Sequence, residues 1–294
     1  MSMWSSIADQ IASETGRPFS VRRQRSVGGG CINSAVLLEG KEGLFFVKLN
    51  ASAGAEMFAA ELAGLREIIN SHTVRAPTPI CWGNAHGYAY LVLEYIAHGK
   101  PNEDSMERLG RDLARMHAVC GKHYGWSRDN TIGSTPQINT ANDNWVDFWH
   151  TQRLQFQLRL AADRGYGGNL QRKGEALLAD LGAFFHDYTP PPALLHGDLW
   201  SGNYMIDENG DAVIFDPAVY YGDRETDLAM TELFGGFPAR FYDAYREAYP
   251  LNSGYSTRKT LYNLYHVLNH LNLFGGGYRR QAEGMIDTLL ASIH

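Results

Sequence analysis

The sequence predicts an α+β fold, with an N-terminal part built on an antiparallel sheet and a larger, mainly helical C-terminal part. In the first hundred of the 294 residues, short apolar runs alternate with turn signals, which is typical of strands. From residue 105 onward, apolar residues recur at helical spacing. The length suits two lobes, and we expect residues 1–96 to form the first and residues 97–294 the second.

The N-terminal elements follow in a definite order. Apolar residues 35–38 and 44–49 flank the polar, glycine-containing segment 39–43, which predicts a hairpin. Residues 56–70 carry apolar side chains at helical period and predict one helix. Residues 88–95 predict a further strand. This lobe therefore combines strands with one key helix.

The C-terminal part reads mainly as helices. The prolines at 190–192 end one helix and lead into an apolar strand. The other expected helices span residues 106–118, 145–162, 227–234, 239–248 and 259–274.

Composition and charge exclude several classes of protein. A net charge of −6 and a pI near 6.0 argue against a nucleic-acid binder. No apolar stretch is long enough to cross a membrane, and residues 1–10 show no secretory signal. The cysteines are odd in number and far apart, so no disulfide framework is expected: Cys31, Cys81 and Cys120. We expect a cytoplasmic protein with no nucleic-acid or membrane partner.

One motif carries the strongest chemical signal. Asp198, Asn203 and Asp216 stand at D-x4-N-x12-D spacing behind a His-Gly pair. Phosphoryl transfer needs a base for the acceptor hydroxyl and oxygen ligands for Mg²⁺. Asp198 is the predicted base, and Asn203 and Asp216 are the predicted metal ligands. Protein kinases place these groups in the same order, so we expect their bilobal fold; the alternative is an ordinary turn and hairpin.

Two neighbours of this motif are predicted to have structural roles. His196 precedes the base and could act as a base itself, but a residue here more often packs and bonds the loop backbone. Asp227 lies early in a predicted helix, where it could cap the helix or brace the loop.

The N-terminal lobe carries candidate nucleotide contacts. Gly28, Gly29 and Gly30, with Asn33, precede the hairpin, and glycines let backbone N–H groups approach phosphates closely. The alternative is a flexible turn. The segment lacks the GxxxxGK[ST] pattern of P-loop NTPases.

Lys48 ends a predicted strand in the context where a lysine holds nucleotide phosphates. Glu61 on the next helix is its predicted partner, and Glu56 is the competitor. The main chain of Glu94 and Ile96, where the apolar strand ends, could bind adenine. The alternative for this segment is an ordinary buried strand.

The acceptor is expected to be a small molecule. Only ten residues, 217–226, separate Asp216 from Asp227. A protein kinase needs an activation segment there, so a platform for peptide docking is not expected.

These residues resemble the fructosamine kinase (ketosamine-3-kinase) family, which belongs with the aminoglycoside and choline kinases. The similarity extends from residue 28 to residue 278. Leu-Trp-Ser-Gly-Asn with Asp-Pro-Ala is far more selective than His-Gly-Asp alone. The matching segments are residues 28–33, 135–137, 196–203, 215–218, 221–223, 234–237 and 269–272.

The resemblance implies transfer of the γ-phosphate of ATP to the 3-hydroxyl of a ketosamine. The unstable product would release the amine, which is a deglycation repair of small molecules or of glycated protein lysines. The resemblance assigns Asp198 as base, Asn203 and Asp216 as Mg²⁺ ligands and Lys48 as the phosphate lysine. Trp200 could pack against the sugar or could be a buried aromatic residue bracing the loop.

Cys31 is a candidate for redox control, because a thiol in the glycine loop could form a disulfide, for instance between two molecules. The protein would then be a monomer or a redox-dependent homodimer. The alternative is a small apolar residue with no such role.

Two other functions compete with this prediction. One is a kinase for another hydroxylated amine, such as an aminoglycoside or choline. The other is a non-catalytic nucleotide-binding module, which should lack a base or a metal ligand. Asp198, Asn203, Asp216 and Lys48 are all present, so the enzyme is favoured.

Overall fold

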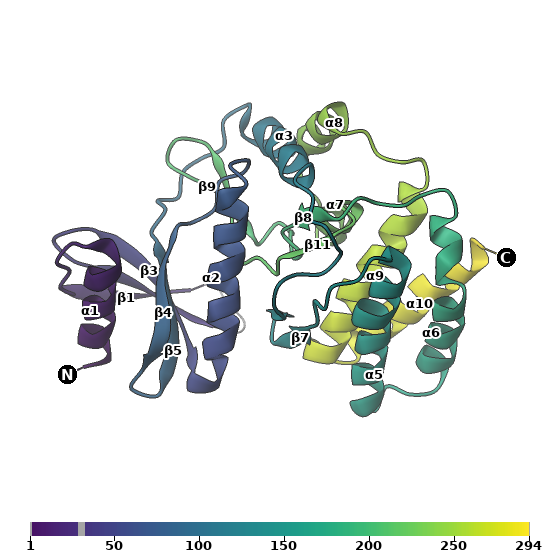
Figure 1. Ribbon diagram of the computed structural model, residues 1–294, viewed down its shortest axis with the longest axis horizontal. Coiled ribbons are helices and arrows are strands. Elements are labelled where there is room, and N and C mark those ends of the chain that lie inside the picture. The colour runs from purple at the N-terminus through teal and green to yellow at the C-terminus, as the bar shows by residue number, and fades with distance from the viewer. Residues whose placement is uncertain (1, 29–32, 294) are drawn as a thin grey trace. The chain divides into compact units, whose positions relative to one another are not determined.

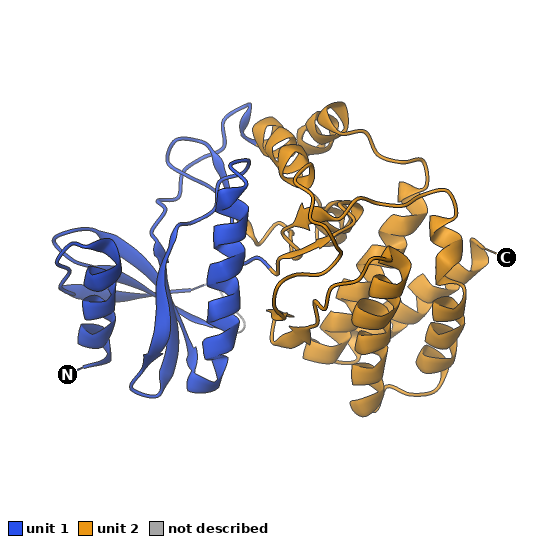
Figure 2. Ribbon diagram, viewed as in Figure 1, with its two compact units in different colours: residues 1–105, 205–217 blue, residues 106–204, 218–294 orange. Residues whose placement is uncertain are grey.

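The computed structural model describes residues 2–28 and 33–293, which fold into two compact units (Figures 1 and 2). The first unit consists of Met1–Ser105 and Met205–Pro217, and the second of Met106–Tyr204 and Ala218–His294. This division departs from the boundary expected at residue 96. Asp216 consequently lies in the first unit, whereas Asp198 and Asn203 lie in the second.

The first unit is built on a five-stranded antiparallel sheet in the order β1-β2-β3-β5-β4. The predicted hairpin is formed by β2 and β3, and the predicted strand at 88–95 is β5. In the register of the sheet, Lys48 on β3 lies opposite Ala35 and Leu91. The strands are β1 (Arg23–Val27), β2 (Ser34–Glu39), β3 (Leu44–Ala51), β4 (Pro79–Ala85) and β5 (Tyr88–Glu94).

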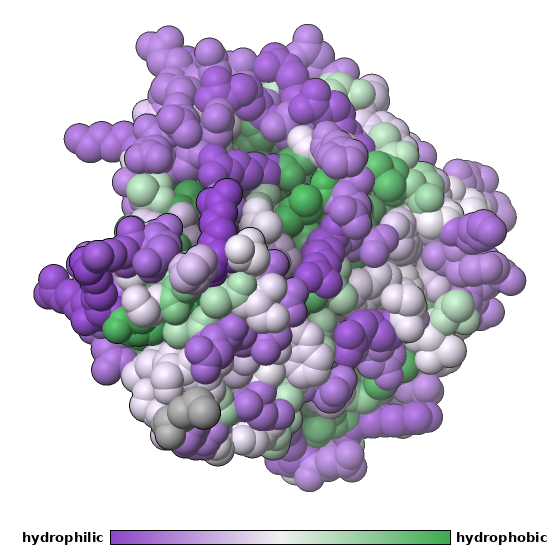
Figure 3. Space-filling model, turned by 60° about the vertical axis from the view of Figure 1, so that its left-hand side comes forward, coloured by the Kyte–Doolittle hydropathy of each residue, from purple (hydrophilic) through white to green (hydrophobic). Residues whose placement is uncertain are grey.

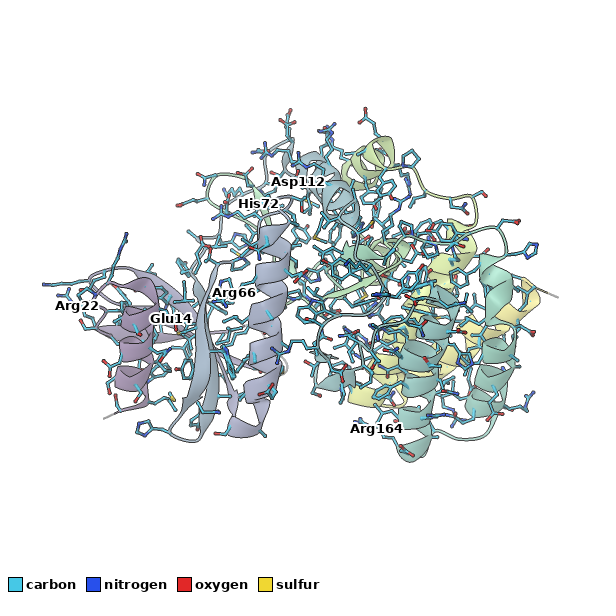
Figure 4. All side chains as sticks on the ribbon, in the orientation of Figure 1. Glu14, Arg22, Arg66, His72, Asp112 and Arg164 are labelled. Atoms are coloured by element: carbon cyan, nitrogen blue, oxygen red, sulfur yellow. The ribbon has the colours of Figure 1, made fainter. Side chains whose placement is uncertain are left out.

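Two helices and a 3-10 turn (Ser52–Gly54) also belong to this unit. Helix α1 (Met3–Thr15) buries Ile7 and Ile11 in a core shared with the sheet. Helix α2 (Ala55–Asn70) matches the helix expected at 56–70. It buries an apolar stripe and exposes the opposite positions, such as Arg66, which is labelled in Figure 4.

A hairpin from late in the sequence joins the first unit. It is formed by β9 (Tyr204–Ile206) and β10 (Ala212–Ile214). The N–H of Gly99 donates to the carbonyl of Ile206 at 2.8 Å, and the N–H of Ile214 donates to the carbonyl of Arg75 at 3.0 Å. These long-range backbone bonds cannot be seen in local periodicity, which is why the boundary expected at residue 96 places residues 204–214 in the C-terminal lobe.

The second unit is mainly helical, as predicted. The helices expected near 227–234 and 259–274 begin at Glu225 and Tyr255, and the run expected at 145–162 contains a π-helix, Trp149–Leu154. The helices are α3 (Ser105–His117), α4 (Trp145–Phe148), α5 (Gln155–Asp163), α6 (Asn169–Ala179), α7 (Glu225–Leu233), α8 (Ala239–Ala248), α9 (Tyr255–Phe274) and α10 (Gly277–Ala291), with a 3-10 helix at Leu181–Phe185.

Helix α9 runs through the core of this unit and is buried along most of its length. Trp145, Trp149 and Tyr262 pack there with ring centroids 4.9–6.2 Å apart. Two short strand pairs lie in the same unit, namely β6 (Asn130–Ile132) with β7 (Thr135–Gln137), and β8 (Ala193–Leu195) with β11 (Tyr220–Gly222). Strand β8 leads directly into the His-Gly-Asp motif.

The face of the molecule drawn in Figure 3 carries mainly hydrophilic residues, with hydrophobic ones in smaller patches, as expected of a surface in water. Within the residues that the structure describes, no helix is long and apolar enough to cross a membrane.

His266 on α9 makes stability depend on pH. The ring is 4% exposed, and burial lowers the pKa to about 3 from 6.5, with His270 and Arg153 acting in the same direction and Asp227 opposing. The folded state therefore binds this proton less tightly than the unfolded state. The stability contribution is present above pH 6.5 and is lost as the pH falls towards 3.

Near pH 5 we expect His266 to reduce the free energy of unfolding by about 2 kcal/mol relative to pH 7. Urea unfolding of wild type and His266→Phe at the two pH values measures this contribution. The variant should lose less stability between pH 7 and pH 5 than the wild type does. An identical loss in both proteins would contradict the assignment.

Candidate active site

The loop after β8 positions the predicted base. Gly197 has φ +81°, and a Cβ added there would collide with the carbonyl oxygen of Ala218. The N–H of Ala218 in turn donates to the carbonyl of His196 at 2.8 Å. Glycine is therefore required at this turn both for its backbone angle and for the close approach of Ala218.

Asp198 is partly buried and is oriented by its neighbours. Its N–H donates to Nδ1 of His196 at 3.2 Å, which gives the buried His196 the structural role expected from the sequence. Asn203 donates its Nδ2 to the carbonyl of Asp198 at 2.8 Å and to the carboxylate Oδ2 at 3.1 Å. Because the amide nitrogen of Asn203 is used in this way, its Oδ1 remains as the oxygen for a cation.

Asp227 braces this loop from α7. Its carboxylate accepts the N–H groups of His196 at 2.7 Å and Gly197 at 2.8 Å, and Nε2 of His117 lies 3.2 Å away. Burial would raise the pKa of Asp227, but these hydrogen bonds and His117 hold it below its ordinary value. The sequence left open whether Asp227 caps its helix or braces the loop. In the structure, its side chain braces the loop.

In the first unit, Lys48 is a buried cation between two carboxylates. Its Nζ donates to Oε1 of Glu61 at 2.6 Å and also to Oδ1 of Asp216. Burial alone would lower the pKa of Lys48, but the charges of Asp216 and Glu61 outweigh it and raise the pKa above its ordinary value. Of the two candidate glutamates, Glu61 is therefore the one paired with Lys48.

Glu61 and Asp216 differ in their surroundings. Burial raises the pKa of Glu61 to about 7 against the attraction of Lys48, and the negative charge of Asp216 acts in the same direction as burial. The Asp216 side chain is 43% exposed, and its backbone has φ +58°, a left-handed conformation that is uncommon for a residue other than glycine. Asp216 thus carries an accessible carboxylate on a strained backbone position two residues after the end of β10.

The glycine segment can be described only in part. Gly28 is exposed, and Asn33 accepts a hydrogen bond from Nδ2 of Asn50 at 2.7 Å. Gly29, Gly30 and Cys31 lie outside the described residues.

The end of β5 is held at Glu94. Its N–H donates to the carbonyl of Thr78 at 2.8 Å, and its carboxylate accepts the N–H of Thr78 at 3.0 Å. The predicted adenine contact at Glu94 would therefore use its carbonyl. Ile96 follows two residues later and is partly buried.

A series of aromatic rings begins at Trp200, two residues after Asp198. Trp200 is 37% exposed, and its ring centroid lies 6.1 Å from that of Phe234. The series continues from Phe234 to His270 at 4.8 Å, and from His270 to Phe274 at 5.4 Å. The sequence singled out Trp200 but missed Phe234 and His270 as members of a site, although both lie in the segments that matched the family pattern.

Comparison with known proteins identifies close relatives along the whole chain. A family model described as fructosamine kinase matches residues 3–292. A Synechocystis protein assigned as a ketoamine kinase is 50% identical over 288 residues, which are 98% of this chain and 97% of that protein. The chloroplastic protein-ribulosamine 3-kinase of Arabidopsis thaliana is 44% identical over 287 residues, covering 97% and 87% of the two chains.

Solved structures agree with this result. A Thermobifida fusca crystal structure assigned to the fructosamine-3-kinases has a TM-score of 0.86 and 33% identity, and the similarity covers 97% of this chain and 99% of that one. A thermostable mutant of the aminoglycoside phosphotransferase APH(4)-Ia, in a ternary complex with ADP and hygromycin B, has a TM-score of 0.63 at 16% identity, covering 98% of each chain. This second similarity extends to the fold alone, and it bears out the kinase-like fold expected from the sequence.

Proposed function

Because the chain belongs to the fructosamine kinase family, we propose that it transfers the γ-phosphate of ATP to the 3-hydroxyl of ketosamines. The loop at Asp198 carries the proposal. There Asn203 donates a hydrogen bond to the carboxylate of Asp198, the proposed base, and Asp227 accepts the backbone N–H of His196. The unstable phosphorylated adduct would then release its amine. Such an enzyme would repair glycated amines, either free or on protein lysines.

Each polar residue of the site has a role that suits its surroundings. Asp198 accepts the proton of the acceptor hydroxyl as the oxygen attacks phosphorus. Asn203 and Asp216 offer a carboxamide oxygen and an accessible carboxylate, which are the hard oxygen donors that Mg²⁺ prefers. When bound, ATP with Mg²⁺ supplies the phosphoryl group and neutralises the charge that develops on it. Lys48, oriented by Glu61, contacts the phosphates.

The aromatic series offers a surface for the acceptor. A sugar presents C–H groups that pack on an aromatic face, and an amine carries a positive charge that an aromatic face attracts. Trp200 has the exposure that such a contact needs, and Phe234 supports its ring.

Trp200→Leu should raise the KM for the ketosamine by about 3- to 10-fold and leave the KM for ATP nearly unchanged, because the ring contacts only the acceptor. Steady-state kinetics with each substrate varied in turn measures both constants. Trp82→Leu is the matched control, since Trp82 is equally exposed, at 38%, but lies on β4. An unchanged acceptor KM in Trp200→Leu would exclude the contact.

The proposed reaction is tested by supplying ATP, Mg²⁺ and a panel of acceptors. The panel contains fructosyl-lysine, ribulosyl-lysine, an aminoglycoside and choline. We expect turnover of the two ketosamines, with phosphorus NMR placing the phosphate on the 3-hydroxyl. Turnover of the aminoglycoside or choline alone, or phosphate on another hydroxyl, would overturn the proposal.

Several expectations remain predictions beside this proposal. They are the cytoplasmic location, the choice between small and protein-bound acceptors, the oligomeric state and the redox role of Cys31.

A further inference from the structure

Two buried amide side chains face each other in the second unit. Asn130 on β6 and Gln137 on β7 are paired residues of this small hairpin, and they are 9% and 1% exposed. A buried amide must have its hydrogen bonds satisfied, so its partners show what it holds in place.

Both amides bind the same backbone segment. Gln137 donates its Nε2 to the carbonyl of Ala218 at 3.0 Å, and Asn130 donates its Nδ2 to the carbonyl of Val219 at 2.8 Å. This segment follows Asp216 by two residues and leads into β11.

The peptide of Ala218 is therefore held on two sides. Its carbonyl accepts from Gln137, while its N–H donates to the carbonyl of His196 at 2.8 Å. Gly197 packs so closely on this carbonyl that no Cβ fits between them. A shift of Ala218 would consequently move the backbone from which Asp198 extends.

Further hydrogen bonds fix the orientation of the Gln137 amide. Its Oε1 accepts from the hydroxyl of Tyr265 at 2.8 Å, and its Nε2 also donates to Oδ1 of Asn130 at 2.8 Å. Asn139 donates to the same Oδ1 at 3.0 Å and accepts from the buried Arg153 at 2.8 Å. In a low-dielectric core, a network with each amide so partnered resists rearrangement.

We propose that Gln137 is a positioning residue, which places the Ala218 peptide and through it the catalytic loop. Asn130 and Tyr265 hold Gln137 in the required orientation. The hydrogen bonds of Gln137 described above join it to Ala218, Asn130 and Tyr265, so its contribution is to the geometry of attack. Misplacing reacting groups by about 1 Å can cost about 100-fold in rate.

The test compares two glutamines of the same unit whose side-chain amides donate to backbone carbonyls. Gln137→Met keeps much of the side-chain volume but removes the hydrogen bonds to Ala218, Asn130 and Tyr265. Gln171→Met is the matched control, because Gln171 on α6 is partly buried and donates its Nε2 to the carbonyls of Leu158 and Tyr166, both at 3.0 Å. The inference rests on the proposed kinase reaction, so wild-type turnover of a ribulosyl- or fructosyl-lysine is measured alongside.

We expect both variants to have a lower Tm, but only Gln137→Met to lose kcat, by about 10- to 100-fold, with the KM values for ATP and acceptor within about threefold of wild type. Equal losses of kcat in the two variants, or an unchanged kcat in Gln137→Met, would overturn the inference. An inactive wild type would instead overturn the proposed function.

A milder variant decides the matter if Gln137→Met does not fold. Tyr265→Phe removes only the hydroxyl that holds Oε1 of Gln137 and retains the packing of the ring. It should lower kcat by at least about threefold at unchanged KM, and an unaltered kcat in the folded variant would refute the role of Gln137.

Discussion

Asp198→Asn should lower kcat by about 100- to 10,000-fold while the protein still binds ATP. The carboxamide has nearly the same shape, and its oxygen can still accept the hydrogen bond from Asn203, but it cannot take the proton of the attacking hydroxyl. Because the loop is braced through backbone N–H groups by Asp227, the substitution should leave the loop in place. Initial rates with a ketosamine give kcat, and calorimetric titration with a non-hydrolysable ATP analogue gives nucleotide affinity.

The control for charge is Asp187→Asn. The side chain of Asp187 is 96% exposed, so loss of its negative charge should leave kcat and ATP affinity unchanged. Retained turnover in Asp198→Asn would exclude this residue as the base. Parallel loss of turnover and of the folded state would mean that its role is structural.

Lys48→Met should lower kcat by about 100- to 1,000-fold, as expected when a buried cation that stabilises developing negative charge is removed. The substitution also leaves Glu61 and Asp216 without the cation between them. We expect a loss of about 3 kcal/mol in the free energy of unfolding, since breaking a buried ion pair strands a charge.

The pH dependence of this loss follows from Glu61. In the wild type its pKa is already raised to about 7 from 4.5, and removal of Lys48 should raise it further. A buried carboxyl whose pKa is raised in the folded protein is protonated and neutral at low pH, so its burial then costs less. The destabilisation caused by Lys48→Met should therefore be smaller near pH 5 than near pH 8.

A double variant separates the two effects of Lys48. Lys48→Met combined with Glu61→Gln should recover stability at pH 8, because the buried charge is gone, without recovering kcat. Lys173→Met is the matched control. Lys173 and Asp287 both belong to the second unit and form an ion pair at a partly exposed site. Such pairs contribute about 1 kcal/mol or less to stability. Recovery of kcat in the double variant would contradict the role of Lys48 in phosphate binding.

Local patterns in the sequence predicted several of the elements, but helices α1 and α10 and strands β1 and β4 were not among them. Residues 56–70 and 239–248 show the helical period, and they form α2 and α8 within one residue of the expected bounds. The π-helix at Trp149–Leu154 escaped prediction, since one wider turn barely alters the spacing of apolar residues. The hairpin of β9 and β10 was not predicted, and the boundary expected at residue 96 placed its residues in the C-terminal lobe. Its partners Arg75 and Gly99 lie more than a hundred residues away along the chain.

The sequence by itself predicted the roles of Asp198, Asn203 and Asp216, because their order and spacing match those of the base and the metal ligands in protein kinases. Only the tertiary structure chose Glu61 over Glu56, assigned Asp227 to the loop and joined Trp200 to Phe234 and His270. Such choices depend on which side chains meet across distant segments, and they are made by packing and by the need to pair buried polar groups. The spacing of residues along the chain does not show which distant side chains pack together or which buried polar groups pair.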